Sequence, residues 1–301
     1  MKNFVYVFLL ALGFLNAGCS TVMTRSFPGT EDSYQIAVTD KHAPEGDWAP
    51  GAYSLGKTNV CFAKTQGEKD PDTAQALFGL IGRAIAVGDM AGELKKMIQG
   101  QDEIFTLDLK GITQENLKRQ LHSSDADSRF TAAPDWKTAP LQITPYAVFS
   151  FIDKEKARFW LVLRLDMIDP ASKYGKKKWS CRYLVGLGEP RPLVGDGGWA
   201  SNNGKLLETT VQKDTALAVK VMLEDLEGNL RTGKEPKDGL WANWAFYKKA
   251  QWADIQKLKS EKDWDIVLPL VEDEEFFAGV NVVPKDFSLP APPDKNGGWG
   301  N

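Results

Sequence analysis

The chain has 301 residues, of which 43% are hydrophobic, so it can bury a sizeable core in one large domain or two small ones. Its formal net charge is −3, and its densest basic run, Lys176-Lys177-Lys178, is typical of a solvated hairpin tip. Binding of nucleic acid depends on clustered Lys and Arg that neutralise phosphates. The composition therefore argues against a nucleic-acid partner.

The N-terminal residues have the pattern of a secretory signal. Lys2 is followed by an apolar stretch over residues 4–15 and then by small residues ahead of Cys19. The apolar stretch is shorter than the roughly 20 residues that a membrane-spanning helix needs. We predict that residues 1–18 are a signal peptide and are removed.

The run Ala17-Gly18-Cys19-Ser20 resembles the lipid-attachment motif of bacterial lipoproteins, although Asn16 stands where leucine is usual. This resemblance covers only the N-terminus. It implies that Cys19 receives diacylglycerol and anchors the protein in membrane lipid. Ser20 then implies the outer membrane of a Gram-negative cell, with the protein facing the periplasm. An ordinary cut after Ala17 would instead release a soluble periplasmic protein.

Residues 19–50 are polar and rich in Thr, Ser, Pro and Gly, which predicts a flexible tether after the lipidated cysteine. An α+β domain is expected over residues 51–231, beginning with a strand or strand pair over residues 53–64 that contains Cys61. Cys181 lies in another β-prone run. In an oxidising periplasm the two cysteines could form a disulfide, and two buried free thiols are the alternative.

Residues 74–98 carry apolar side chains at helical spacing after the cap and first-turn signal Asp70-Pro71. Glycines at four positions of this helix each cost about 1 kcal/mol relative to alanine. Core packing, a bend near Gly88 and an exposed interface with lipid or a partner helix could each account for them. In the last case the interaction surface comprises Leu77, Phe78, Ile81, Arg83 and Ile85.

The middle of the chain predicts a strand over 104–109, a helix over 113–121 and three antiparallel strands over 143–152, 159–168 and 178–187. In the second of these strands the side of Arg164 and Asp166 should face water. A glycine-rich loop over 195–204 lacks the spacing of a phosphate-binding motif and is expected to be a turn. It leads into a helix over 206–226. The order of elements predicts a two-layer sandwich of antiparallel sheet and helices.

The C-terminal part predicts short aromatic strands within residues 240–287, as a small barrel-like β-rich unit or an extension of the first sheet. Residues 288–301 are expected to be a disordered tail. Four aromatic residues of this region could fill a core; exposed, they could instead bind sugar rings or a protein. They are Trp241, Trp244, Phe246 and Trp252.

No recognisable catalytic set, cofactor motif or metal-ligand spacing is present in the sequence, so an enzyme is the less favoured hypothesis. His122 precedes Ser123-Ser124-Asp125, but neighbours on one loop cannot form a catalytic relay. We therefore predict a non-enzymatic role in binding or assembly of an envelope complex, with another envelope protein as partner. Alternatives are a lipoprotein that binds or cleaves peptidoglycan or another polysaccharide, a structural scaffold, and a soluble periplasmic binding protein.

Overall fold

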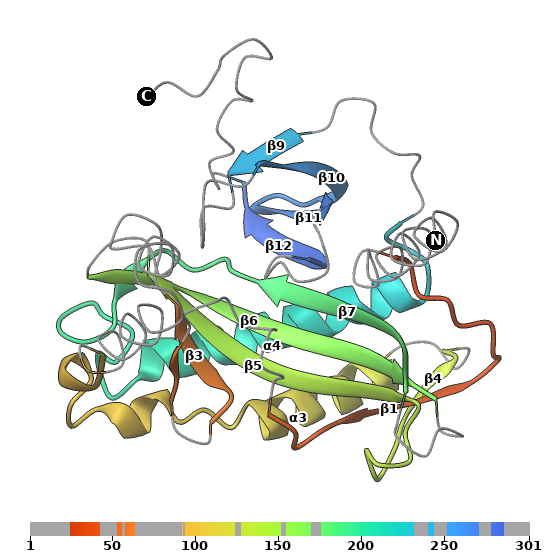
Figure 1. Ribbon diagram of the computed structural model, residues 1–301, viewed down its shortest axis with the longest axis horizontal. Helices are drawn as coiled ribbons and strands as arrows, with labels where there is room; N and C mark the ends of the chain where they lie inside the picture. The colour runs from red at the N-terminus through yellow and green to blue at the C-terminus, as the bar shows by residue number, and fades with distance from the viewer. Residues whose placement is uncertain are drawn as a thin grey trace, which may run out of the picture.

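Figure 1 shows a computed structural model of the chain. It describes residues 25–42, 53–55, 58–63, 92, 94–123, 128–151, 155–169, 176–231, 240–243, 252–270 and 278–285. Strands dominate these residues. They are β1 (Tyr34–Val38), β2 (Tyr53–Ser54), β3 (Val60–Ala63), β4 (Phe130–Ala132), β5 (Leu141–Phe151), β6 (Lys156–Ile168), β7 (Lys177–Val185), β8 (Arg191–Pro192), β9 (Leu240–Asn243), β10 (Trp252–Ser260), β11 (Trp264–Leu270) and β12 (Val280–Pro284).

The helices of the described residues are the 3-10 helix η1 (Asp102–Phe105), α3 (Leu109–Ser123) and α4 (Lys205–Leu226). Residues 94–97, at the end of the helix expected over 74–98, are also helical, and Leu94 and Ile98 are buried in the core. The rest of that expected helix, 74–91 and 93, lies outside the described residues except for Gly92.

One sheet contains all twelve strands, in the order β2-β3-β5-β6-β7-β12-β11-β10-β9, with β1, β4 and β8 attached beside this path. The pairs β5–β6 and β6–β7 are antiparallel, and β1–β5, β3–β5 and β12–β7 are parallel. The protein is thus a mixed α and β structure with a large, mostly antiparallel sheet and few helices.

The antiparallel meander β5–β6–β7 confirms the three strands predicted from alternation. Leu161, Leu163 and Leu165 point toward the helices and are fully buried. The opposite side of β6 was expected to face water, and this expectation is wrong. Arg164 and Asp166 are each only 7% exposed, and they remain charged in the interior by pairing with each other at 3.0 Å.

Helices α3 and α4 lie on one face of the sheet, behind the strands in Figure 1. Helix α4 begins after a loop of turns over 195–204, as predicted. Gly204, at the N-cap of α4, has φ of 74°, and a Cβ there would meet Ile104 at 2.4 Å. Glycine satisfies both the left-handed backbone and this close approach. Trp199 of the loop is buried and donates from Nε1 to the Ala157 carbonyl at 2.8 Å, which fixes the loop to the start of β6.

The strand expected over residues 104–109 is absent, because η1 ends at Phe105, residues 106–108 have no regular structure and α3 begins at Leu109. The amide of Gly111 donates to Asp108 Oδ1 at 2.9 Å, so the Asp108 carboxylate caps the first turn of α3. The predicted helix over 113–121 therefore starts four residues too late. The Thr113 hydroxyl, expected at the helix start, instead donates to the Leu109 carbonyl inside the helix.

The segment after the expected anchor differs most from the prediction. Residues 25–42 were assigned to a flexible tether, but Tyr34–Val38 forms β1, which pairs in parallel with β4 and β5. Tyr34, Ile36 and Val38 belong to the hydrophobic core. The described part of this segment is an integral part of the fold.

The C-terminal strands β9 to β12 form an antiparallel series, and β12 pairs in parallel with β7. The pairing makes them an extension of the first sheet, one of the two arrangements that the sequence predicted. A closed barrel would require β9 to pair with β12, and the described strands have no such pairing. The expected tail, 288–301, lies outside the described residues.

The disulfide between Cys61 and Cys181 is not formed; both thiols are free and buried. Cys61 of β3 is opposite Val148 of β5, which is opposite Trp160 of β6. Cys181 of β7 is opposite Leu165 of β6. Trp160 and Leu165 are five positions apart, so the two cysteines point to opposite faces of the sheet. Three interstrand spacings, about 14 Å, also separate their strands, and a disulfide needs Cα atoms within about 7 Å. The alternative of two buried free thiols describes this structure.

Candidate functional site

Most residues of the expected interaction surfaces lie outside the described residues. These are Leu77, Phe78, Ile81, Arg83, Ile85, Trp244 and Phe246, and the expected lipid-attachment residue Cys19 lies outside the described residues as well. Trp241 and Trp252 lie on the neighbouring strands β9 and β10, where Trp241 is opposite Asp254 and Trp252 is opposite Asn243. In the described part of the chain, a dense set of side-chain interactions lies where residues 25–34, the N-terminal segment, pack against the rest of the folded body.

An aromatic cluster fixes the N-terminal segment to the body. The Phe27 ring lies 5.2 Å from Tyr34, 6.1 Å from Phe130 and 5.4 Å from Trp179, measured between ring centroids. Trp179 also donates from Nε1 to the Arg25 carbonyl at 3.0 Å. These contacts join residues 25 and 27 to strands β1, β4 and β7, so the body begins at Arg25 or before it.

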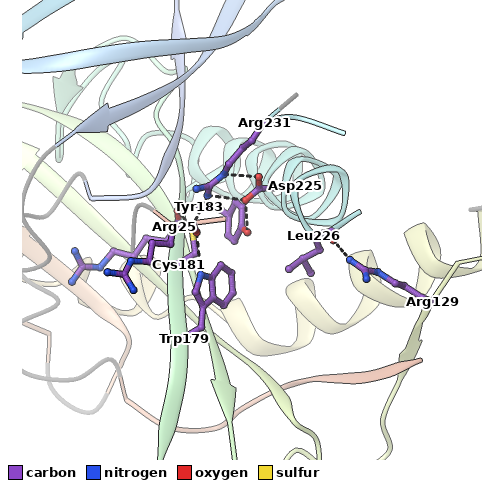
Figure 2. A network of polar contacts seen from close by, with 9 residues as sticks. Arg25, Arg129, Trp179, Cys181, Tyr183, Asp225, Leu226 and Arg231 are labelled. Carbon is purple, nitrogen blue, oxygen red and sulfur yellow. Dashed lines mark hydrogen bonds and ion pairs between the residues drawn. The ribbon is translucent and has the colours of Figure 1, made fainter. Parts of the chain in front are cut away.

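Arg129 also holds the N-terminal segment, through the carbonyl of Gly29. Its guanidinium donates to the carbonyls of Gly29, at 3.3 Å, and Leu226, at 2.5 Å. The Leu226 carbonyl is one of the last of α4, which lack helical partners, so Arg129 caps this helix while holding the N-terminal segment (Figure 2). The guanidinium carbon also lies 5.5 Å from the Phe27 centroid and 5.2 Å from that of Phe130.

We expect Arg129→Met to loosen the segment without emptying the space beside the rings. Loss of hydrogen bonds from a charged donor should cost about 1.5 kcal/mol locally, which corresponds to about tenfold faster trypsin cleavage after Arg25. The N-terminal fragment is measured by mass spectrometry. Arg119→Met, at an exposed position of α3, is the matched control and should leave the rate unchanged. Equal rates for the two variants would contradict the role of Arg129.

A buried ionic network ties the end of α4 to β7 (Figure 2). Arg231 donates to Asp225 from Nε at 2.8 Å and from Nη2 at 2.9 Å, and the Tyr183 hydroxyl donates to the same carboxylate at 2.9 Å. Nη2 of Arg231 also lies 3.5 Å from the Cys181 sulfur. The Asp225 side chain is 1% exposed and that of Arg231 is 9% exposed. A two-pronged ion pair of this kind is strong and geometrically specific.

The Tyr183 hydroxyl and the Cys181 thiol of this network keep their protons at neutral pH. Burial, and then the charge of Asp225, raise the pKa of Tyr183 well above its usual value. Burial raises the pKa of Cys181 to about 11, despite the nearby charge of Arg231. A nucleophilic cysteine needs a lowered pKa. The geometry is that of a structural link between helix and sheet.

A second charged cluster lies on the opposite face of the sheet. Asp166 accepts from Arg164 at 3.0 Å and from the Ser180 hydroxyl at 2.5 Å, and Lys177 Nζ lies 2.9 Å from its other oxygen. Burial alone would raise the pKa of Asp166, but Arg164, Lys177 and Ser180 together lower it. The carboxylate is therefore charged at neutral pH and links β6 to the start of β7.

Asp214 stands apart from these satisfied groups. It lies in the middle of α4, is 2% exposed, and its Oδ2 atom is buried without a hydrogen-bond partner. Burial raises the pKa of Asp214 to about 7, although the charge of Lys213 lowers it slightly. A buried carboxyl with this pKa costs folding free energy when it ionises.

The described groups do not assemble into a catalytic or metal-binding constellation. Across these ranges, no three side chains of His, Cys, Asp or Glu gather closely enough to hold a metal ion. His122 lies at the exposed end of α3, with Nδ1 2.6 Å from the Lys118 carbonyl, as expected for a helix-end residue. None of the helices in the described ranges has the length and apolarity to span a membrane.

No protein-family model matches this chain, and no curated protein matches it significantly.

Proposed function

We propose that this protein is an outer-membrane lipoprotein that faces the periplasm and has a non-enzymatic role in binding or assembly of an envelope complex. The observation that carries the proposal is the position of Cys19. It closes a signal-like segment and stands only six positions before Arg25, the first residue of the described body. Acyl chains on Cys19 would attach this folded body directly to the bilayer.

The nature of the body supports a role in binding or assembly. Two of its buried carboxylates are paired with arginines, Asp225 with Arg231 and Asp166 with Arg164. They stiffen the junctions between β7, α4 and β6. A rigid body with α3 and α4 layered on one face of the sheet, which we propose as a two-layer sandwich, suits the presentation of a surface to another envelope protein.

We expect the Cys19→Ala variant to lose the lipid. The intact mass of the wild-type protein, purified from native membranes, should correspond to residues 19–301 plus acyl chains, and the variant should carry none. An unmodified wild-type chain beginning at Gly18 would contradict the lipoprotein proposal. It would favour the alternative of a soluble periplasmic binding protein.

A positive result makes the partner the next question. Crosslinking of the acylated protein in membranes, followed by identification of the crosslinked chains, tests the assembly role. Recovery of peptidoglycan or another polysaccharide in place of a protein would favour the carbohydrate-binding alternative.

A further inference from the structure

We infer that the end of the sheet beside the anchor carries a surface for anionic lipid headgroups, formed by Arg25, Lys176, Lys177 and Lys178. This inference rests on the proposed lipid attachment at Cys19. The occupant that we assign to the surface is the bilayer into which the acyl chains of this chain insert.

The first step is the position of the four cations. The Arg25 carbonyl accepts from Trp179 Nε1, so the backbone of Arg25 lies beside the start of β7 (Figure 2). Trp179 immediately follows Lys176-Lys177-Lys178 in the sequence. All four cationic residues are exposed, and the side chains of Lys177 and Lys178 are 43% and 51% exposed. The basic run, which the sequence alone assigns to an ordinary hairpin tip, thus lies beside Arg25, the first described residue after the proposed anchor.

The second step is the charge. Two carboxylates lie against this group: Asp166, 2.9 Å from Lys177, and Asp169, 3.5 Å from Lys178. The four cations and these two carboxylates of the described residues sum to +2, in a chain whose overall charge is −3. The net charge at this end of the sheet is positive, whereas that of the whole protein is negative. A positive surface is complementary to anionic phospholipid.

The third step is the reach of the anchor. Arg25 is six positions after Cys19, and six fully extended residue steps span about 20 Å. The cations are therefore held near the headgroups, where the Debye length is about 10 Å at 0.1 M salt. Each basic residue at an anionic surface favours binding by about fivefold. A tether of some thirty residues would leave the body free to turn relative to the bilayer. This short connection instead directs the end of the sheet beside Arg25 toward the bilayer.

The test uses the acylated full-length mature protein, with the acyl mass verified first, in vesicles of phosphatidylethanolamine with or without phosphatidylglycerol. A membrane-impermeant amine-acetylating reagent modifies exposed lysines, and mass spectrometry gives the rate at each one. We expect Lys176, Lys177 and Lys178 to react several-fold more slowly in the anionic vesicles, and 1 M salt should remove the difference. Lys156 and Lys205 serve as internal controls at the opposite end of the sheet, because Lys156 begins β6 and Lys205 begins α4 after the loop fixed to Ala157.

A charge-reversed variant isolates the surface. In Lys176→Glu/Lys178→Glu, Lys177 remains as the reporter, and its protection in anionic vesicles should fall to the level seen in neutral ones. The matched variant Lys156→Glu/Lys205→Glu makes the same change in charge at the far end and should keep the protection. Unchanged thermal unfolding shows that both variants fold.

The outcomes separate the two proposals. Acylated protein whose Lys177 reacts equally in both vesicles, or equally in both variants, overturns the headgroup surface and leaves the lipoprotein proposal standing. An unmodified Cys19 overturns the lipoprotein proposal, and the headgroup surface that rests on it fails with it.

Discussion

Arg231→Met is expected to lower the free energy of unfolding by about 3–5 kcal/mol, because it leaves the buried Asp225 carboxylate without its cationic partner. The carboxylate is held at 1% exposure between α4 and β7, and Tyr183 is then the only one of its three described hydrogen-bonding contacts to persist. Methionine keeps much of the volume of the arginine stem, so the loss reports the charge and not a cavity. Urea denaturation followed by tryptophan fluorescence measures the change.

The double variant Asp225→Leu/Arg231→Met removes both charges and should recover most of this loss, since an apolar pair no longer strands an ion in the interior. Glu224→Ala provides a contrast at the partly exposed pairs with Lys220 and Lys259, where about 0.5 kcal/mol is expected. A loss below about 1 kcal/mol for Arg231→Met would show that the network does not hold the end of α4 to the sheet.

Asp214→Asn is expected to stabilise the protein at alkaline pH and to have little effect near pH 4. The pKa of Asp214 is raised from its usual value of 3.8 to about 7 in the folded protein, so the folded state binds the proton more tightly than the unfolded state does. The stabilisation from that proton is fully present below pH 4 and is lost as the pH rises toward 7. Three pKa units correspond to about 4 kcal/mol at most.

Unfolding free energies of wild-type and variant, measured from pH 4 to pH 8, test this expectation. The difference should grow to about 2–4 kcal/mol by pH 7–8 and then level off, because both states of the wild type are ionised above the folded pKa. Asp196→Asn removes an exposed carboxyl from the 195–204 loop and should change stability by less than about 0.5 kcal/mol throughout. Parallel pH curves for wild type and Asp214→Asn would show that Asp214 ionises without cost.

Local pattern was sufficient to predict the meander and the last helix. The alternation through Leu161, Leu163 and Leu165 marks one face of β6, and the apolar spacing before Gly228 marks α4. The same reasoning failed at residues 104–109, where Phe105, Leu107 and Leu109 also alternate. There Asp108 caps the start of α3. An alternating pattern of only six residues did not predict this helix start.

The remaining differences arise from contacts between distant parts of the chain. The polar surroundings of Tyr34, Ile36 and Val38 concealed an alternating strand, which pairs with residues about a hundred positions later. The choice between a disulfide and two free thiols depended on which face each cysteine occupies, and the register across three strand pairs fixes that.

The proposed headgroup surface likewise depends on contacts between distant parts of the chain. The sequence identified Cys19 and the lysine run separately, at positions 19 and 176–178. The position of residues 25–29 against β7 and α4 depends on Trp179 and Arg129, which bind the carbonyls of Arg25, Gly29 and Leu226. Phe27 was the available sign in the sequence that this segment packs against the body. The polar composition around it led to the prediction of a linker.

The parallel pairing of β12 with β7 has a consequence for how the chain reaches its native state. Residues 183–185 must wait for residues 280–282, almost a hundred positions later, before that edge of β7 is covered. Pairings of such high contact order form slowly, and an uncovered strand edge invites association with other chains. Under the export that we propose for this chain, β12 cannot cover this edge of β7 until residues 280–282 have been translocated. The folding of this protein is therefore expected to depend on protection of the β7 edge until β12 has paired with it.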